Sequence, residues 1–520
     1  MKMKKMIIVL ICFLMLPAFS LQAQRIEPGD LHYIGAFRLP DGSGGSDWNY
    51  SGMAMTWYPQ GDADGPDDGF PGSLFAVGHD HQQFVSEISI PPPVISPSKN
   101  PADLPVARTL QPFAEITAGM FGYLEMPTPG LAWLPAKGDQ SSGKLYWCRG
   151  QHIQYQEPTH GWCETDLSNP RSVGPWYFGD HNNYTTCDYL FDIPQRWADE
   201  NVNGYSLASG RWREGIWSGM GPAFYASAPW LEEELSPADS TISATIPLLL
   251  YGIDDPALPE IVTHDSMKMN DYNPGDQWTG ACWLTAGDRS ALLFAGTRAV
   301  GNTWYGYSDG TVWPEEGPWP PVPEWPHDNR GFWSDSISAR FLFYDTDDLA
   351  AVARGDLNSY QPQPYAVLDI NHLLFDPGYG ITRYKRFNLG AACFDRENGL
   401  LYVMERQADE EKSLVHVWRL RGESTRIGDH KEPDCHLLLQ NYPNPFNPRT
   451  RIEYRLSVPG HVHLSILDVL GQQCAVLVDR VQTRGVYKMS WNARGLASGT
   501  YIIQLKTAGQ LVLRRAVLIR

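Results

Sequence analysis

Four residues in one aromatic-rich part of the chain have types that suit proton removal from an acidic sugar. His181 and Tyr184 lie close together, and Arg211 and Arg213 follow further along the chain. An arginine beside a uronate carboxylate lowers the barrier to removal of the adjacent C5 proton, and a histidine or tyrosine can accept that proton. These four residues are therefore the predicted catalytic residues of a uronate-directed elimination.

A wider set of residues in the same region could hold the sugar itself. Aromatic rings stack on the CH faces of sugars, while arginine, histidine and asparagine form directional hydrogen bonds with hydroxyls and carboxylates. The predicted ligand-binding residues are His152, Trp217, Arg298, Trp304 and Tyr305. The alternative is that these aromatic residues pack the long loops, which is the better interpretation for any single tryptophan. Polysaccharide lyases on β-propeller scaffolds are similar in general style, but no lyase motif matches residue by residue.

Two other functions compete with a lyase. A glycosidase would need two carboxylates about 5 to 9 Å apart, and the many acidic residues of this chain do not single out a pair. The other class is a non-catalytic surface module that binds a glycan or a protein. P-loop, dinucleotide-binding, GxSxG and HExxH motifs are missing from the sequence, which disfavours nucleotide-dependent and serine-hydrolase functions.

Metal binding has weak support. His79 and His81 have a spacing that would put both rings on one face of a strand, but exposed loop histidines are the more frequent case. The acidic run 62–69 resembles a calcium loop in composition, although it lacks the glutamate that an EF-hand requires at its twelfth position. We predict no metal ligand, and calcium is the one candidate cofactor.

Charge is divided unevenly along the 520 residues. The formal net charge is −18, whereas residues 24–440 alone carry −29 and residues 441–520 carry +8. A body this acidic repels nucleic acid and anionic membranes at long range, so nucleic acid is excluded as a partner. The change of sign indicates two separate units.

The first 23 residues predict a signal peptide. Lys2, Lys4 and Lys5 precede an apolar run over 6–16, and Ala23 is a small residue at the expected cleavage position. The run is short for a membrane anchor, which needs about 20 residues, and no later segment is long and apolar enough to span a bilayer. The mature protein is therefore expected to be secreted or held on the cell surface, without a transmembrane span.

Export to an oxidising compartment bears on the cysteines. Seven remain after the signal peptide, so at least one lacks a partner within the chain. Cys148 and Cys163 could close a loop that stabilises the fold by about 3 kcal/mol. Cys282 and Cys393 lie in apolar runs and are expected to be buried thiols.

Residues 24–425 contain a repeated pattern of short strands. Each copy opens with small residues, continues through a tight turn and adds a second apolar strand; the copies begin at 52, 130, 280 and 390, with a degenerate one at 221. Short antiparallel sheets at long intervals predict an all-β fold, a β-propeller of about five to seven blades. A β-helix and a pair of sandwiches are the competing folds. Residues 346–355 predict one loop helix, with acidic residues at its start and a glycine at its end.

Residues 440–520 follow a linker at 426–439 and have a different texture. Period-two alternation with frequent turns predicts a small immunoglobulin-like β-sandwich. The opening NYPNPFNP at 441–448, the LDVLG turn at 467–471, the SGTY step at 498–501 and the basic end at Arg520 resemble the C-terminal sorting domain of the type IX secretion system of Bacteroidetes and relatives. The resemblance implies that the type IX secretion machinery recognises this segment during export across the outer membrane. An ordinary immunoglobulin-like accessory module is the alternative.

Overall fold

The computed structural model describes most of the chain after the predicted signal peptide. The described residues are 25–62, 68–138, 140–212, 214–231, 240–255, 257–258, 261–325, 327–376, 386–421, 437–438, 441, 444–456, 460–469, 471–483, 485–507 and 511–519. The signal peptide, Arg213, Cys435, most of the acidic run 62–69 and most of the linker lie outside these residues. The chain divides into two compact units, Met1–Glu423 and Ser424–Arg520, and each is described by itself.

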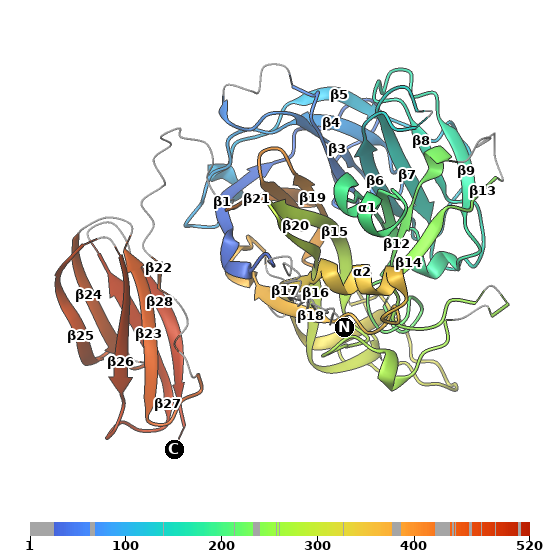
Figure 1. The fold of residues 1–520 in the computed structure, drawn as a ribbon. Coiled ribbons are helices and arrows are strands. Elements are labelled where there is room, and N and C mark those ends of the chain that lie inside the picture. The colour runs from blue at the N-terminus through green and yellow to red at the C-terminus, as the bar shows by residue number, and fades with distance from the viewer. Residues whose placement is uncertain are drawn as a thin grey trace, which may run out of the picture. The chain divides into compact units, whose positions relative to one another are not determined.

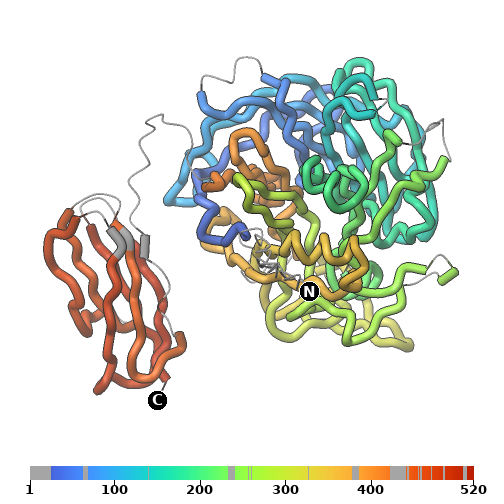
Figure 2. Tube along the Cα trace, viewed as in Figure 1, coloured from blue at the N-terminus to red at the C-terminus, as the bar shows by residue number. Residues whose placement is uncertain are grey.

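The larger unit is built from five small open sheets (Figures 1 and 2). The first contains β2 (Met55–Tyr58), β3 (Ser73–Val77), β4 (Val85–Ser89) and β5 (Thr109–Ala114). The second contains β6 (Thr128–Leu134), β7 (Lys144–Gly150), β8 (His160–Cys163) and β9 (Val173–Phe178), extended by the short parallel strand β13 (Thr241–Ile242). The third contains β10 (Tyr189–Asp192), β11 (Leu207–Gly210), β12 (Phe224–Ser227) and β14 (Thr245–Leu249).

The two remaining sheets have longer strands. The fourth contains β15 (Gln277–Ala286), β16 (Arg289–Gly306), β17 (Gly331–Tyr344) and β18 (Pro364–Asp369). The fifth contains β19 (Leu389–Asp395), β20 (Leu400–Asp409), β21 (Lys412–Leu420) and β1 (Leu31–Arg38). Because β1 comes from the start of the chain and pairs with β21, with Leu31 opposite Leu420, this sheet ties the two ends of the unit together.

The first strand of each sheet contacts the first strand of the next. β2 contacts β6, β6 contacts β10, β10 contacts β15, β15 contacts β19, and β19 contacts β2 again. Residues from all five of these segments line one small axial cavity of about 10 Å³, at the lower limit for a single water. The five sheets therefore surround a common centre, and their first strands are the innermost ones.

Small residues in the first strands follow from this crowding. A Cβ placed on Gly390 would lie 1.9 Å from the carbonyl oxygen of Gly52, and one on Gly280 would lie 2.3 Å from the carbonyl oxygen of Gly390. Any side chain at these two positions would push neighbouring sheets apart. Larger apolar side chains fill the wider spaces further from the centre, as in the core cluster that contains Phe294, Leu342 and Tyr344 of the outer strands β16 and β17.

Helices are few, and the predicted one is present. α2 (Thr346–Arg354) begins after the N-cap Asp345, whose side chain accepts from the Asp347 backbone, and ends at Gly355 in the left-handed conformation. α1 (Gln195–Asn201) was not predicted.

Two predictions about this unit were wrong. The segment at 221 does not open a repeat, because its strand β12 is the third in its sheet and β10 is the first. Cys148 and Cys163 form no disulfide, and the six described cysteines are free. Cys148 pairs with His160 and Cys163 with Leu145, so the two lie three positions apart along the β7–β8 ladder. That is about 10 Å, beyond the reach of a disulfide.

The smaller unit consists of two antiparallel sheets over one core. One sheet contains β22 (Leu437–Leu438), β23 (Arg449–Leu456) and β26 (Gly485–Asn492), and the other contains β25 (Gln473–Gln482), β24 (Gly460–Leu467), β27 (Gly499–Lys506) and β28 (Leu511–Leu518). Ile452 and Tyr454 from the first sheet and Ile466 and Ile503 from the second belong to the same buried cluster. The predicted sandwich strands are present, and β25 is an addition to them.

Candidate functional site

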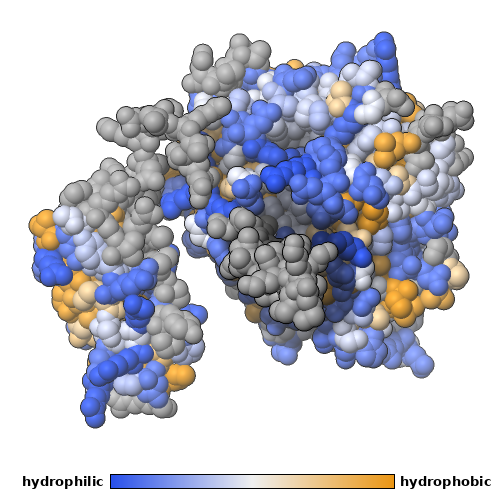
Figure 3. All heavy atoms as spheres, in the orientation of Figure 1, coloured by the Kyte–Doolittle hydropathy of each residue, from blue (hydrophilic) through white to orange (hydrophobic). Residues whose placement is uncertain are grey.

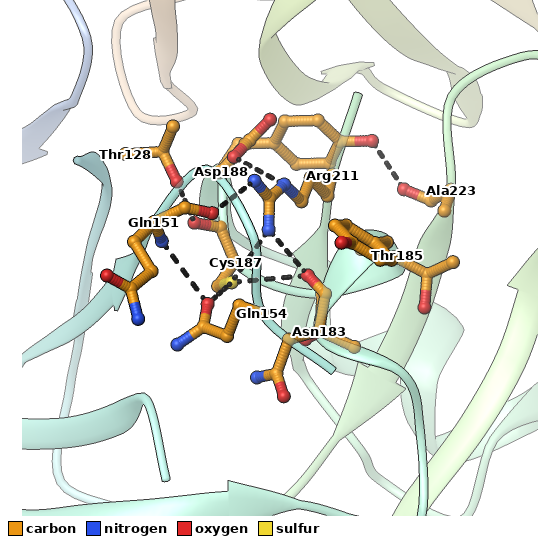
Figure 4. Close-up of polar contacts among 12 residues, drawn as sticks. Thr128, Gln151, Gln154, Asn183, Thr185, Cys187, Asp188, Arg211 and Ala223 are labelled. Atoms are coloured by element: carbon orange, nitrogen blue, oxygen red, sulfur yellow. Dashed lines mark hydrogen bonds and ion pairs between the residues drawn. The ribbon is translucent and has the colours of Figure 1, made fainter. Parts of the chain in front are cut away.

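Arg211 and Asp188 lie at the centre of the region that the sequence singled out. Arg211 directly follows β11, Asp188 directly precedes β10, and the ladder between these strands brings the two side chains together. Arg211 Nε lies 3.2 Å from Asp188 Oδ1, and the side chains are only 1% and 5% exposed (Figure 4). The pair is therefore a buried ion pair beside the axial cavity, which Asp188 borders.

The remaining donors of Arg211 hold the neighbouring loops. Nη1 donates to the carbonyl oxygen of Asn183 and Nη2 to that of Gln151, each at 2.9 Å. Burial opposes the charge of Arg211, but Asp188, together with Cys187 and Tyr184, raises the pKa of Arg211 above its usual value. Burial likewise raises the pKa of the adjacent Cys187 thiol to about 11, so this thiol is protonated at neutral pH. The guanidinium thus joins three segments of chain.

Tyr184 belongs to the same cluster. Its ring lies 5.7 Å from the Arg211 guanidinium, and it packs against Trp217 and Tyr155 at centroid distances of 5.1 and 5.4 Å. Tyr184 is fully buried. The structure therefore brings together the predicted residues Tyr184, Arg211 and Trp217, with Tyr184 as the buried centre of an aromatic group.

His181 belongs to a second network, organised by Asp254. The ring nitrogens of His181 contact Asp254 Oδ2 at 3.2 Å and Thr245 Oγ1 at 3.0 Å, so both have partners. Asp254 also accepts from the Tyr225 hydroxyl at 3.0 Å and from the Asn182 backbone N–H at 3.0 Å. The Asp254 side chain is almost fully buried. Through these contacts, the loop before β10 is held against β12 and β14. No sequence pattern singles out Asp254, which lies in an irregular loop further along the chain.

Arg298 forms a second buried ion pair, in the fourth sheet. Its Nε lies 3.5 Å from Asp276 Oδ2, and its guanidinium lies 5.5 Å from the ring of Trp278. Burial raises the pKa of Asp276 to about 7, although Arg298 and the backbone N–H of Ala299 lower it. The Asp276 backbone carbonyl also accepts from the indole of Trp212. This predicted ligand-binding arginine therefore has a buried acid partner.

Trp304 and Tyr305 lie on the long β16–β17 hairpin, whose end carries a group of exposed rings. We call Tyr305, Trp313, Trp319, Trp325 and Arg330 the aromatic tip. Trp313 and Trp319 stack with centroids 5.1 Å apart and planes 9° apart, and the Arg330 guanidinium lies 4.2 Å from the ring of Trp313. Trp319 is 56% exposed and Trp325 is 81% exposed. Large apolar side chains exposed this far and grouped together are typical of interaction surfaces.

The loop end of the β16–β17 ladder meets the loop that follows Arg211. A Cβ on Gly215 would lie 3.1 Å from the ring of Phe332. The ring of Tyr305 packs against the same Phe332 ring. Glu214 forms a 2.7 Å ion pair with Arg386, and that guanidinium lies 5.4 Å from the ring of Trp333 on β17. Trp217, in the loop after Arg211, and the strand residues Trp304 and Tyr305, at the end of β16, thus lie on two segments joined by these contacts.

The other predicted residues have plain surroundings. His152 is half-buried, and its backbone N–H donates to Glu125 O at 2.8 Å. Trp304 donates from its indole to the carbonyl of Tyr307. His79 and His81 lie near each other, with centroids 5.8 Å apart, and His79 Nδ1 is 3.3 Å from Asp80. In the part of the chain that the structure describes, no group of three or more His, Cys, Asp or Glu side chains could hold a metal ion.

A pocket of about 250 Å³ lies toward the C-terminal ends of the first strands, whereas Asp188 and Arg211 lie at the N-terminal end of one of them. Its wall is mixed and includes the aromatic residues Trp57, Trp133 and Phe394. An ion pair between Arg396 and Asp192 lines one side. None of the residues predicted for catalysis or ligand binding lines this pocket.

Comparison with known families identifies the smaller unit. Residues 440–520 match the model of the secretion system C-terminal sorting domain. The resemblance read from the NYPNPFNP, LDVLG and SGTY segments is confirmed, and with it export to the cell surface or the medium and recognition by the type IX machinery. Among the described residues, no helix is long and apolar enough to cross a membrane.

Two solved structures are similar to most of this chain at low identity. The comparison with curated protein sequences gives no match. Among solved structures, PorZ, an essential surface component of the type IX secretion system of Porphyromonas gingivalis, is 13% identical with a TM-score of 0.29, covering 92% of this chain. This chain spans about half of PorZ, 53% of its length. A fungal alcohol oxidase of the AA5 family in complex with copper is 8% identical with a TM-score of 0.23, covering 91% of this chain and 86% of its own.

Proposed function

We propose that the larger unit is a five-bladed β-propeller. The support is the cyclic order of contacts from β2 through β6, β10, β15 and β19 back to β2. The pairing of β1 with β21 adds to it, because a strand from each end of the unit completes one sheet, which protects the ring from opening. Each blade would then be one of the five sheets, with its first strand at the axis.

We further propose that this propeller binds an extracellular polysaccharide. The observation that carries the proposal is the stack of Arg330, Trp313 and Trp319, with Trp325 exposed on the same hairpin end. Flat aromatic surfaces offered to solvent suit the CH faces of sugar rings, and the guanidinium can hydrogen-bond to hydroxyls and carboxylates. The sorting domain places this surface outside the cell, where polysaccharides are available.

Binding without turnover is the better-supported form of the proposal. Both ring nitrogens of His181 contact polar partners, Asp254 and Thr245. Tyr184 is fully buried. Arg211 forms an ion pair with Asp188 and donates to two backbone carbonyls. Groups held this way stabilise the loops that carry the ligand-binding residues. The uronate lyase stays a prediction, and its signature would be the absorbance of an unsaturated uronate.

The test is binding of the secreted full-length protein to a panel of neutral and acidic polysaccharides by affinity gel electrophoresis. We expect at least one polysaccharide to retard the wild type, and the W319A/W325A double variant to migrate as it does without polysaccharide. Phe121, a half-buried aromatic residue of another loop, serves for a control variant, F121A. Equal retardation of wild type and W319A/W325A, or no retardation by any polysaccharide, would overturn the proposal.

A further inference from the structure

The second strand of every sheet carries a basic residue at the same place. In each sheet this basic residue follows an apolar residue of the second strand by four positions. The basic residues are His79 after β3, Arg149 in β7, Arg211 after β11, Arg298 in β16 and Arg406 in β20. The strand registers support the equivalence. Arg149 lies opposite Pro129, and Arg211, Arg298 and Arg406 each come one position after the residue that pairs with Tyr189, Gln277 or Leu389 in the neighbouring first strand. The sheets therefore repeat one basic position at one end of the ring.

The residue opposite this position differs between sheets. Asp188 lies opposite Arg211 and Asp276 opposite Arg298, and both form buried ion pairs. In the fifth sheet the residue in the same register is Asn388, whose backbone carbonyl accepts from the Arg406 N–H at 2.9 Å. In the second sheet it is Pro129. Two of the four arginines thus lack the acid that the other two have.

Arg149 and Arg406 use their charge differently. Arg149 is 3% exposed, and its donors go to the backbone carbonyls of Cys148 and Gln83. Arg406 is half-buried, its Nε has no hydrogen-bond partner, and no ion pair to it exists among the described residues. The Nε atoms of Arg211 and Arg298 also lack a hydrogen-bond partner, but each faces an aspartate. Of the repeated arginines, Arg406 is therefore the half-buried one that has no ion pair among the described residues.

A second arginine reinforces the charge at Arg406. The guanidinium groups of Arg386 and Arg406 lie 4.9 and 5.8 Å from the same ring, that of Phe387. Burial lowers the pKa of Arg406, and Arg386 lowers it further, while Asp80 acts in the opposite direction. Arg386 is 8% exposed and forms an ion pair with one carboxylate, that of Glu214. Glu214 is the one carboxylate that forms an ion pair with either guanidinium among the described residues, and Asp80 is the next acid that acts on Arg406.

Two glycines make room for the Arg406 side chain. A Cβ on Gly52 would lie 3.0 Å from Arg406 Cγ, and one on Gly390 would lie 3.2 Å from it. Both glycines belong to the crowded segments at the axis, so the stem of Arg406 lies next to the axis of the ring. An open cleft of about 590 Å³ lies at the corresponding position of the first sheet, where His79 and Gln82 border it.

We propose that Arg406 and Arg386 form a binding site for the oxyanion of an acidic sugar, a carboxylate or a sulfate ester. A guanidinium binds such groups through paired N–H donors, and a partly buried site weakens the screening by salt. The site is joined to the aromatic tip through Arg386, which lies against Trp333, and Trp333 is next to Phe332, the residue opposite Tyr305 in the ladder. The identity of the ligand as a polysaccharide rests on the proposed function, whereas the anion site itself does not.

The test is isothermal titration of the full-length protein with galacturonate oligosaccharides, with sulfated galactan oligosaccharides and with neutral galactan oligosaccharides. We expect one acidic series to bind at least ten-fold more weakly to R406Q than to the wild type. We expect N388D to have the same effect, because an aspartate there would neutralise Arg406 as Asp188 neutralises Arg211. Which acidic series binds distinguishes the carboxylate from the sulfate ester.

Controls separate this site from the aromatic tip. R196Q removes one positive charge from an exposed arginine on α1, which is 79% exposed, and it should bind as the wild type does. The monosaccharide galacturonate and inorganic sulfate are too small to bridge to the tip, so W319A/W325A should bind them as the wild type does if the anion site is real. Unchanged affinity in both R406Q and N388D, with folding confirmed by thermal melting, would overturn the inference even if the tip binds polysaccharide.

Discussion

The carboxylate of Asp188 lies 3.2 Å from Nε of Arg211, and both side chains are almost completely buried. Asp188 immediately precedes the innermost strand of its sheet and Arg211 immediately follows the second strand, so the backbone ladder sets their distance. The fourth sheet repeats the arrangement with Asp276 and Arg298. A repeated pair of this kind is a structural device of the sheets, and the departures from it mark where charge is left for a ligand.

Removing one member of the Asp188–Arg211 pair should destabilise the protein strongly. R211M leaves the Asp188 carboxylate buried without its cation and frees the carbonyls of Asn183 and Gln151, so the free energy of unfolding should fall by about 3 to 5 kcal/mol. The double variant D188N/R211M should lose less than the sum of the single variants. Urea unfolding followed by tryptophan fluorescence measures these values, and additive losses would contradict coupling between the two groups.

Asp276 should make stability depend on pH. Burial raises its pKa to about 7, so between about pH 4 and pH 7 the folded state holds a proton that the unfolded state has released. The free energy of unfolding should therefore fall as pH rises through this range, by up to about 1.4 kcal/mol per pH unit for this one group. D276N cannot titrate, and its stability should fall less over the same range. Parallel pH profiles for wild type and D276N would show that Asp276 ionises normally.

The architecture was largely predictable, because alternation and small-residue openings report burial and crowding directly. The repeats beginning at 52, 130, 280 and 390 supplied the first strands of four of the five sheets. The remaining first strand, β10 of the third sheet, was missed because it opens with Tyr189 and Leu190 rather than with glycine and alanine. The disulfide between Cys148 and Cys163 was wrong because sequence spacing carries no information on ladder register.

The described cysteines should behave as buried thiols. Burial raises the pKa of Cys163 to about 12 and that of Cys187 to about 11, so neither forms much thiolate below pH 9. Native protein treated with iodoacetamide at pH 8 should be modified at the half-buried Cys474 far faster than at Cys148, Cys163, Cys187, Cys282 or Cys393. Peptide mass mapping reads the sites. A reducing agent should leave the melting temperature unchanged, and a drop would indicate a disulfide.

The Asp254 network should stabilise the protein without acting in turnover. D254A removes the acceptor for His181, Tyr225 and the Asn182 backbone N–H, so we expect a loss of about 2 to 4 kcal/mol in the free energy of unfolding. T245A removes one partner of His181 and should cost only about 1 kcal/mol. H181A should bind polysaccharide as the wild type does. A loss of eliminated product in H181A, measured as unsaturated uronate, would instead assign His181 to catalysis.

The candidate site was only partly predictable. Residue types drew attention to Tyr184, Arg211 and Trp217, and the fold does bring these together. The partners that define their role depend on the fold. Asp188 reaches Arg211 across the β10–β11 ladder, and Asp254 reaches His181 from a loop 73 residues further along the chain, so no local pattern predicts either pairing. The aromatic tip could be suspected from its many tryptophans and prolines, but its stacking on Arg330 depends on how the hairpin folds back. Arg406 became visible only once strand registers aligned it with Arg211 and Arg298.

The most direct test of the account is the affinity of the wild type and of W319A/W325A for the polysaccharide that retards the wild type most. The account predicts saturable binding, at least ten-fold weaker in the double variant, with equal melting temperatures and no absorbance from an unsaturated uronate. Equal affinities would contradict the aromatic tip as the binding surface, and an absorbance rise with wild type would show that the protein is a lyase.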